Sequence, residues 1–518
     1  MVAASLLLLT ACTAPNPNLV PGQGDAEADT DTNNSDGANG DVTDEEGRAG
    51  DTDGEPEGDT PADTPGPDGN NGNPGDTGTD GGDMDGPDTN PDADPDAPGD
   101  TNGEDTDPDA DPDMGDPDAD DPDASPDCNA NLCADPAPRC ANDTSVEQRW
   151  SGACDDGVCL YDTEETECAA GCCDGGCCEV TPANIGRFGR IQTTGRNLEA
   201  PDEFHTEDDC RLDGPLGVCA VTEPAQGVSA CVCRVDNLEI DDLRVDGPHA
   251  LVILASGSVV VSGRLDISAD ATAPGPGARP AYSAVATERH GGSGASFGTH
   301  GGRAPGGERA AVRGTANLEP LEAGAHGQSA CEVRGGGGAG ALQITAAVSL
   351  DIAGEIRAGG GGGAGGDDGL DCNGGAGGGS GGAVLLEAPE VEISGVIWAA
   401  GGGGGSGGVA PGNDSRSGRR GEDASPGRNP AEGGEARTKD GCGLDTITSG
   451  GGGYGAVGSL EAGNGGGGDF QSCLLEQHSA GDGGAGGGLG RVRINSLSGC
   501  DCGGNIEPNP SLGQLGVR

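Results

Sequence analysis

The stretch IAGEIRAGGGGGAGG (Ile352–Gly366) sets the narrowest limits on the fold of this chain, because an alternating apolar pattern runs straight into glycine. Glycine loses more conformational freedom on folding than any other residue, so it is poor in the interiors of strands and helices. The chain has 106 glycines among 518 residues, so the pattern recurs. Such runs are either flexible linkers or places where backbones lie too close together for side chains.

Three apolar stretches share a short repeat. They are VVVSGRLDISA (Val259–Ala269), SLDIAGEIRAG (Ser349–Gly359) and EVEISGVIWAA (Glu390–Ala400), and in each the apolar residues alternate on both sides of a glycine. This alternation predicts two short strands joined at a tight corner where a Cβ atom would not fit. One such unit cannot bury its apolar face, but stacked copies can. We therefore expect a mostly β fold with a glycine-rich parallel β-helix, a solenoid, over residues 237–499.

The stretch NLEIDDLRVDGPHALVILASG supplies the first rungs of this predicted solenoid. Strand alternation points one set of side chains inward, namely Leu238, Ile240, Leu243, Val245, Leu251 and Ile253, and another toward solvent, namely Glu239, Asp242, Arg244 and Asp246. After each later corner the chain runs through glycine, a cysteine-bearing loop and glycine again. We expect these glycines either to pack against a neighbouring rung or to form a polyglycine sheet.

The cysteines predict disulfides. Apart from Cys12, the 21 cysteines fall into blocks with even numbers. The blocks are Cys128, Cys133, Cys140, Cys154, Cys159, Cys168, Cys172, Cys173, Cys177 and Cys178; Cys210, Cys219, Cys231 and Cys233; and Cys331, Cys372, Cys442, Cys473, Cys500 and Cys502. Even blocks are typical of exported, cross-linked modules. A zinc tetrathiolate in CAAGCCDGGCCE (Cys168–Glu179) is the alternative, but no Cys-x-x-Cys pair recurs at finger spacing.

These blocks divide the second part of the chain. We expect a cysteine-rich module over 128–180, a disulfide-bonded linker and N-terminal cap over 181–236, and a C-terminal tail over 500–518. Trp150 and Tyr161 are expected to form the small core of the module rather than a sugar-binding platform. Cys331, Cys372, Cys442 and Cys473 would fasten the glycine-rich excursions, which favours order over free linkers.

Residues 13–127 are almost entirely Asp, Gly, Pro, Thr, Asn and Ala, and predict a disordered acidic stalk because nothing there can offset chain entropy by burial. More than half of the net charge of −63 comes from this segment, which argues against a nucleic-acid partner. The Asp-x-Asp spacing loosely resembles thrombospondin-type calcium repeats. Proline stands where their turn glycine belongs, so a solvated spacer is favoured over calcium sites.

The first twelve residues, MVAASLLLLTAC, end in Leu9-Thr10-Ala11-Cys12, which resembles the lipobox of bacterial lipoprotein signal peptides. This resemblance implies cleavage before Cys12 and anchorage to the membrane by lipid on its thiol. A positive n-region is missing, so we expect that the true start lies upstream. Thr13 implies, by the same resemblance, an outer-membrane lipoprotein, and we expect the chain to be exposed at the cell surface.

Two further resemblances concern the modules. The segment from Cys140 to Cys178 resembles small cysteine-rich modules in exported proteins of myxobacteria and related deltaproteobacteria, with Cys173 and Cys178 additional to the pattern. Residues 209–499 resemble the glycine-rich regions of surface lipoproteins from the same bacteria. These resemblances imply a disulfide-rich surface lipoprotein and bring no activity with them.

Few residues could carry chemistry. The cluster DDLRVDGPH (Asp241, Asp242, Arg244, Asp246 and His249) is the best catalytic candidate, but alternation makes most of it an outer charged ladder. GGAGGDDGL (Gly362–Leu370) begins like an RTX calcium nonapeptide but is not in tandem. The excursion from Ser415 to Gly441 balances cations against acids and is expected to be a solvated loop.

We therefore expect a lipid-anchored cell-envelope protein with a structural or adhesive role, without catalysis, metal or cofactor, and with an envelope glycan or protein as partner. The alternatives are a polysaccharide-active lyase or hydrolase on the same scaffold, and a calcium-dependent surface assembly protein.

Overall fold

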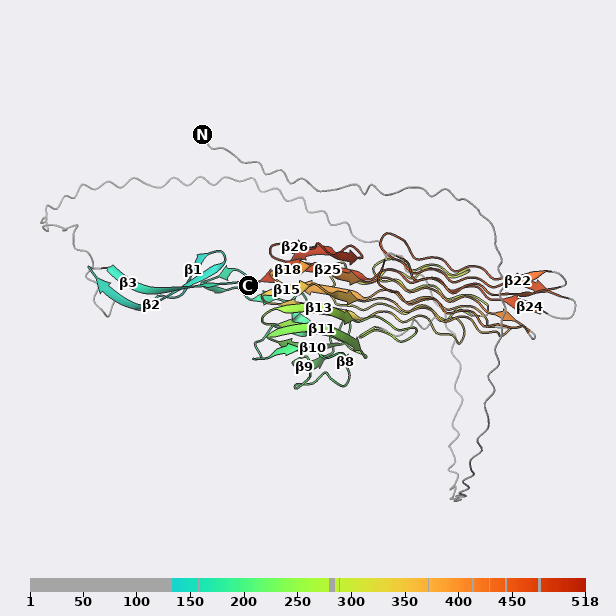
Figure 1. Cartoon of the computed structure of the whole chain (residues 1–518), viewed down its shortest axis with the longest axis horizontal. Coiled ribbons are helices and arrows are strands. Elements are labelled where there is room, and N and C mark those ends of the chain that lie inside the picture. Colours follow the sequence, from blue (N-terminus) through green and yellow to red (C-terminus); the bar gives the residue numbers. More distant parts are fainter. Residues whose placement is uncertain are drawn as a thin grey trace, which may run out of the picture. The chain divides into compact units, whose positions relative to one another are not determined.

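The computed structural model describes residues 133–518 except 157, 279–284, 288, 371, 412–413, 428, 443–444 and 474–476. The expected signal peptide, the stalk, Cys12 and Cys128 therefore lie outside the described residues. The described chain is mostly β, and its short helix is α1 (Ile185–Phe188). In Figure 1 the strands of the sheets are stacked at the centre, and the long segments that continue from them run side by side to the right.

The cysteine-rich module is a three-stranded antiparallel sheet, β1 (Arg139–Asn142), β2 (Ser145–Asp155) and β3 (Val158–Glu167), followed by the short pair β4 (Cys172–Cys173) and β5 (Gly176–Cys177). Its disulfides join Cys133 to Cys159, Cys140 to Cys172, Cys168 to Cys177 and Cys173 to Cys178. Trp150 and Tyr161 are only half-buried. The cystines thus replace the expected aromatic core, as is usual in modules too small to bury much apolar surface.

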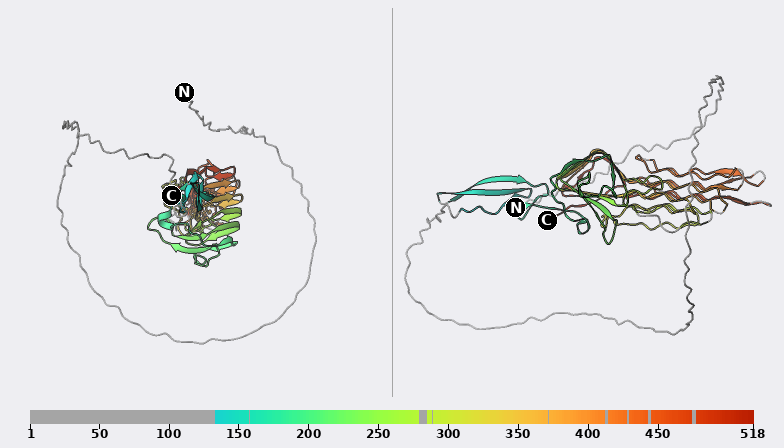
Figure 2. Two further views of the ribbon diagram at one scale, coloured as in Figure 1. Left: turned by 90° about the vertical axis from the view of Figure 1, so that its left-hand side faces the viewer. Right: turned by 90° about the horizontal axis from the view of Figure 1, so that it is seen from below.

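Two sheets of mainly parallel strands form the next region (Figure 2). The seven-stranded sheet holds β9 (Val218–Thr222), β10 (Ala230–Val235), β12 (Ala250–Ala255), β14 (Ala341–Ala346), β17 (Ala383–Glu387), β25 (Arg491–Ser496) and β28 (Ser511–Gln514). The ten-stranded sheet holds β7 (Asn197–Glu199), β8 (Glu203–His205), β11 (Asn237–Asp246), β13 (Val259–Asp266), β15 (Ser349–Ile352), β16 (Glu355–Arg357), β18 (Glu390–Ile393), β19 (Val396–Trp398), β26 (Cys500–Asp501) and β27 (Asn505–Glu507).

On the inner face of each sheet, apolar side chains of neighbouring strands stack in columns. In the ten-stranded sheet Leu243, Leu265, Ile356, Ile397 and Ile506 are successive partners in parallel register. Together with the inward side chains of the seven-stranded sheet they form the main apolar core. The six residues expected to point inward from the first rungs are each at most 2% exposed, which confirms that prediction. Glu239 and Asp242 are exposed, also as expected, whereas Arg244 and Asp246 are half-buried.

The corner glycines of the repeat stack directly on one another. A Cβ atom at Gly354 would overlap the carbonyl oxygen of Gly263, one at Gly395 would overlap that of Gly354, and one at Gly504 would overlap that of Gly395. The prediction of a corner where Cβ does not fit is therefore confirmed. Because the clash is with backbone, no side-chain movement could relieve it.

The seven-stranded sheet is covered on its other face as well. Val232, Val252 and Leu385 pack there against Phe188 and Phe297 in a second apolar cluster. This explains why β12 and β14 are buried along their entire length instead of alternating. Strands buried on both faces lose the period-two pattern, so their sequences read as continuous small and apolar runs.

The residues expected to be a cap and a tail both extend the sheets. The cap carries β9 antiparallel to β10 and the disulfides Cys210–Cys231 and Cys219–Cys233. Residues 500–518 are not the expected tail: they supply β26, β27 and β28, and finish with β29 (Gly516–Val517) against β6 (Val180–Thr181). The reason is that Ile506 continues a buried column of the core and Gly504 continues the corner column.

Between these strands the chain makes long excursions, and we call the described parts of 267–340, 358–382, 399–469 and 481–490 the glycine array. Its central segment, 373–382, shows how it is built. The N–H groups of Gly375, Gly378 and Gly381 donate to residues 482, 485 and 488 on one neighbouring segment. Those of Ala376, Gly379 and Gly382 donate to residues 364, 361 and 358, and those of Gly377 and Ser380 donate to 328 and 325.

The carbonyl groups of the central segment also change partner from one residue to the next, and they bind three other segments. Successive carbonyls of the central segment accept from segments 292–295, 336–339 and 402–408. Each neighbour is thus met at every third residue, which is the period of the polyproline II helix, with three residues per turn. Of the two expected arrangements, close packing of neighbouring backbones is the one observed. The alternative of a polyglycine sheet, in which partners would recur at every second residue, is not.

Close packing, and not a special backbone conformation, is what demands glycine here. A Cβ atom at Gly377, Gly378 or Gly379 would overlap a neighbouring carbonyl oxygen. None of the three has a positive φ, so an L-residue could adopt their backbone conformation. Collagen uses glycine at its crowded axis for the same reason. The linker interpretation of the glycine runs is thus wrong for these described segments.

Short antiparallel strands occur within the excursions. They are β20 (Val409–Ala410), β23 (Phe470–Ser472) and β24 (Gln477–Ala480) in one sheet, and β21 (Thr438–Asp440) and β22 (Thr446–Thr448) in another. Disulfides Cys331–Cys372 and Cys442–Cys473 join neighbouring turns, as expected from their positions. The excursion from Ser415 to Gly441 is not simply the expected solvated loop, because Gly418, Gly421 and Gly434 donate hydrogen bonds within the array.

Candidate functional site

The charged cluster singled out in the sequence does not converge on one point. Asp242 forms two 3.0 Å hydrogen bonds with Arg264 on the next strand, and Arg244 lies 3.0 Å from Asp266. Asp246 binds the Nδ1 atom of His205. Neighbouring strands thus pair these charges along the outside of the sheet. The structure gives a ladder of ion pairs, and Asp241 is exposed beside it.

The two histidines near this ladder have separate partners. The hydrogen bond that His205 donates to Asp246 raises the pKa of this exposed histidine above 6.5, with a further contribution from the charge of Asp246. His249 lies 2.7 Å from the hydroxyl of Ser229 through its Nδ1 atom. The sequence alone gives no sign of this Ser–His contact, because Ser229 lies in the cap, 20 residues away.

The predicted calcium motif is divided between two environments. A Cβ atom at Gly363 or Gly366 would overlap backbone of the central segment, so these glycines belong to the array. Asp367 and Asp368 follow in an exposed turn. In the part of the chain that the structure describes, the groups of side chains close enough to share a metal ion are Cys219 with Cys231 and Cys233, and Cys442 with Cys473 and His478. The cysteines of both groups are in disulfides.

The disulfide prediction is confirmed for the described cysteines. The pairs stay inside the blocks of the sequence, and Cys500 pairs with Cys502. Cys154 is also disulfide-bonded. A zinc tetrathiolate in Cys168–Glu179 is excluded, because Cys168, Cys172, Cys173, Cys177 and Cys178 are all in disulfides.

One buried carboxylate has the features of a functional residue but is fully engaged. Burial raises the pKa of Glu387, which is 1% exposed. Its oxygens accept hydrogen bonds from Gln343, Thr345 and Asn495 on neighbouring strands and from the backbone N–H of Ala183. Glu387 therefore fastens the start of the cap to the seven-stranded sheet, and no side of it is left for a ligand.

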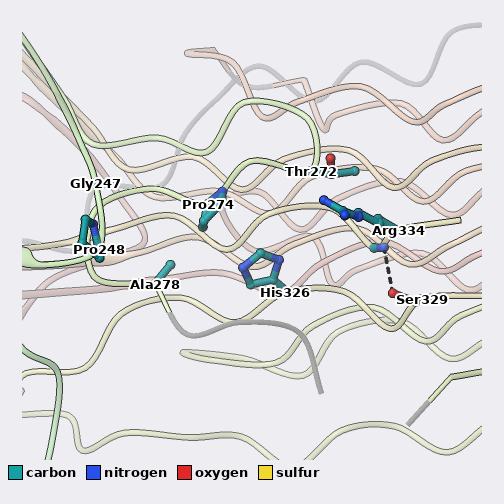
Figure 3. Close-up of a pocket in the computed structure, with 9 residues that line it drawn as sticks. Gly247, Pro248, Thr272, Pro274, Ala278, His326, Ser329 and Arg334 are labelled. Atoms are coloured by element: carbon teal, nitrogen blue, oxygen red, sulfur yellow. Dashed lines mark hydrogen bonds between the residues drawn. The ribbon is translucent and has the colours of Figure 1, made fainter. Parts of the chain in front are cut away.

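A cavity of about 730 Å³ lies between the array and the turn after β11 (Figure 3). It is lined by Gly247, Pro248, Thr272, Pro274, Ala278, His326, Ser329, Arg334 and Gly335. In Figure 3 the His326 ring lies between Pro274 and the segment that carries Ser329, whose hydroxyl accepts a 3.4 Å hydrogen bond from the N–H of Gly335. His326 is the side chain of this set whose protonation could change near neutral pH.

His326 also lines a second cavity, of about 360 Å³. Segments 293–296 and 325–328 of the array form two walls, and residues 307–313 form the third. Among the described residues, neither Nε2 of His326 nor Oγ of Ser293 has a hydrogen-bond partner, and both atoms are buried. Burial lowers the pKa of His326 below 6.5, so its imidazole is neutral at pH 7. A neutral imidazole and a hydroxyl can each donate or accept a hydrogen bond.

The sequence holds a weak signal for this site. The chain has six histidines, and His326 stands within an array segment of mostly small residues, AGAHGQSA. Its cavity depends on segments far apart in the chain, which no local motif reveals. Ser293 lies in a glycine-rich stretch where a serine is unremarkable.

Neither known families nor known structures supply an assignment. No protein-family model, no curated protein and no solved structure matches this chain. Among the described residues, no helix has the length and apolar character needed to cross a membrane.

Proposed function

We propose that this chain is a cell-envelope lipoprotein, held by lipid on Cys12 and exposed on the outer membrane, with a structural or adhesive role. The order of its segments supports this: a lipobox-like N-terminus, an acidic spacer, a cystine-rich module and a rigid β region. We also propose that the two parallel sheets are the faces of a β-helix. From β10 on, each successive turn of the chain adds one strand to the seven-stranded sheet and either one long or two short strands to the ten-stranded sheet, as a solenoid requires.

The single observation that carries the proposal is the three-residue hydrogen-bond period of the glycine array. It makes the excursions a rigid support instead of a tether. Such a support holds the turns between its segments in fixed positions, which suits the display of short, non-repeating loops. Two of these turns are further fastened by the Cys331–Cys372 and Cys442–Cys473 disulfides.

The β23–β24 hairpin, which carries Phe470 and is called the Phe470 turn below, is the part of this display best suited to bind a partner. Phe470 is 51% exposed, and the guanidinium of Arg289 lies 5.2 Å from the centre of its ring. An arginine guanidinium is attracted to the face of an aromatic ring, and both aromatic residues and arginine are enriched in protein contact surfaces. The partner would be an envelope glycan or protein that meets this turn.

Catalysis is not part of the proposal, because the charged cluster on β11 pairs across strands. A polysaccharide-active enzyme stays the alternative. Such an enzyme would have to use the Ser229–His249 pair as its catalytic residues. Calcium-dependent assembly concerns the acidic stalk, which lies outside the described residues.

Adhesion of intact cells tests the proposal. Cells that produce the full chain should adhere to their own purified envelope material, and Phe470→Ser should reduce that adhesion. Leu512→Ser is the matched control, since Leu512 is 64% exposed on β28, far along the chain from this turn. Cys12→Ser should release the protein from the membrane fraction. Equal adhesion by the Phe470 and Leu512 variants, with both proteins folded, would contradict the adhesive role.

A further inference from the structure

We propose that the cavity between residues 293–296, 307–313 and 325–328 binds a small organic acid that carries a hydroxyl group beside its carboxylate. This site is separate from the Phe470 turn and goes beyond the structural role proposed above. Two buried polar atoms without partners, the apolar walls and the charges at the rim support it.

The two unpartnered atoms are the first observation. Ser293 and His326 stand on neighbouring segments and line the same cavity, and Oγ of Ser293 and Nε2 of His326 are both buried without a partner among the described residues. Ser293 is 5% exposed, and its N–H is held by the side-chain oxygen of Gln328 at 2.9 Å, so its position is fixed. A buried polar atom left unpaired costs about 1–3 kcal/mol, which a ligand that pairs with it can recover.

The size and walls of the cavity limit the ligand to a small molecule. A volume of about 360 Å³ is at the lower end of the range of small-molecule sites. Ala295, Ala310, Ala311 and Ala325 supply methyl groups to the lining. The described lining residues include no Phe, Tyr or Trp, so a sugar would find no large aromatic platform on which to stack.

The rim favours an anion. Residues 307–313 bring Arg309 and Arg313 to the cavity together with one acid, Glu308. Arginine binds carboxylates through two parallel hydrogen bonds, so an exposed Arg309 is suited to hold the acid group at the entrance. The hydroxyl of the ligand would then reach inward to Ser293 and His326, where a single group can donate to one and accept from the other.

Residues 307–313 also control access. A Cβ atom at Gly307 would lie 2.8 Å from Oγ of Ser293, so the loop closes directly over the serine. Glu308, Arg309 and Ala311 on this loop are exposed. We therefore expect a ligand to reach Ser293 by a small displacement of residues 307–313.

Three probes of nearly equal size separate the parts of the proposal. Lactate has both groups, propionate lacks the hydroxyl, and 1,2-propanediol lacks the carboxylate. We expect ligand-detected NMR with the purified, disulfide-bonded full chain to rank them lactate, propionate and then 1,2-propanediol. Ser293→Ala should weaken lactate binding about tenfold, as expected for one lost hydrogen bond, and change propionate binding less than about twofold.

Two further variants keep the test decisive if Ser293→Ala disturbs folding. Arg309→Gln should weaken both acids and leave 1,2-propanediol unchanged. Gly307→Ala should block all binding, whereas Gly369→Ala, at a glycine with open space around it, should not. Equal binding of all three probes, no detectable lactate binding at about 10 mM, or lactate binding that survives Gly307→Ala in a folded protein would each overturn the proposal.

Discussion

The paired strands and the glycine array solve the same problem in opposite ways. Between the two sheets, side chains such as Leu243 and Ile356 fill the space, and the backbone bonds only to strands on either side. In the array, the backbone itself fills the space, and segment 373–382 bonds to neighbours in several directions. The strands are stabilised by burial of apolar surface. The array relies on backbone hydrogen bonds and close packing, since its glycines have almost no apolar surface to bury.

The two regions should therefore tolerate opposite kinds of substitution. In the strands the harmful change is the loss of a side chain, because it leaves a cavity. In the array the harmful change is the gain of one, because the new atom meets backbone that cannot move aside. Substitutions in each region, matched with neutral positions nearby, test this contrast.

The largest effect is expected from the smallest added group in the array. Gly379→Ala places a Cβ atom on the carbonyl oxygen of Gly337, and Gly379 lies in the central segment with neighbours on several sides. We expect a loss of more than about 3 kcal/mol in the free energy of unfolding, at the upper end of overpacking effects. Chemical denaturation measures it.

The matched control for that variant is Gly369→Ala. A methyl group at Gly369 would meet no other atom within 4 Å, and this glycine does not have a positive φ. Its substitution should leave stability unchanged or raise it by about 0.5 kcal/mol, because alanine reduces the entropy of the unfolded chain. Similar losses at both glycines would mean that the glycines serve conformation and not packing.

Ile356→Ala tests the strand side. Ile356 is fully buried in the column that runs from Leu243 to Ile506. Its truncation should cost about 3 kcal/mol through lost burial and the cavity left behind. Glu239→Ala, at an exposed position of β11, should change stability by less than about 0.5 kcal/mol. A loss below about 1 kcal/mol at Ile356 would show that the sheets do not depend on this core.

The disulfides extend the contrast, because one fastens the array and another lies in the sheets. Cys331 and Cys372 are 41 residues apart, whereas Cys500 and Cys502 are 2 apart. If the cross-links act on the unfolded chain, replacing the first pair by serine should cost about 2 kcal/mol more than replacing the second. Thermal unfolding of the two double variants measures the difference, and equal losses would contradict an entropic role.

The smallest effect concerns two histidines, one in each region. Burial lowers the pKa of His326 in the array, and the Asp246 hydrogen bond raises that of His205 on β8. The stability contribution of neutral His326 is present above pH 6.5 and is lost as the pH falls through its lowered pKa. That of His205 is present below pH 6.5 and is lost as the pH rises through its raised pKa.

NMR titration of protein with isotope-labelled histidine checks the direction of both pKa shifts. The pKa of His326 should lie below 6.5 and that of His205 above it. Asp246→Asn should return the His205 pKa toward 6.5 and leave that of His326 unchanged. Identical pKa values for the two histidines in the unmodified protein would mean that their surroundings do not differ as described.

The strands could be predicted from the sequence because their apolar and polar side chains alternate. Leu238, Ile240 and Leu243 alternate with charged residues, and the repeated corner glycine marks where the strand turns. Cysteine positions likewise limited the disulfides to blocks. The prediction of a tail at 500–518 is wrong because Ile506 is a lone apolar residue among polar ones, and its column becomes visible only beside Ile397.

The array could be predicted only in part. Glycine has no side chain, so a run such as Gly359–Gly363 contains no period that would separate a sheet from a three-residue helix. The direction of each N–H group is set by segments far away in the chain, as between Gly292 and Gly375. The cavity beside His326 could not be predicted for the same reason, since Ser293 and His326 become neighbours only through this packing.

Amide hydrogen exchange along residues 374–382 decides whether the glycine array is ordered by its three-residue hydrogen-bond pattern. If it is, these amides should exchange at least about a thousandfold more slowly than an unstructured chain, as do the strand amides of β14 and β17. Exchange at the rate of an unstructured chain in 374–382, while β14 and β17 stay protected, would contradict the account and return the glycine runs to flexible linkers.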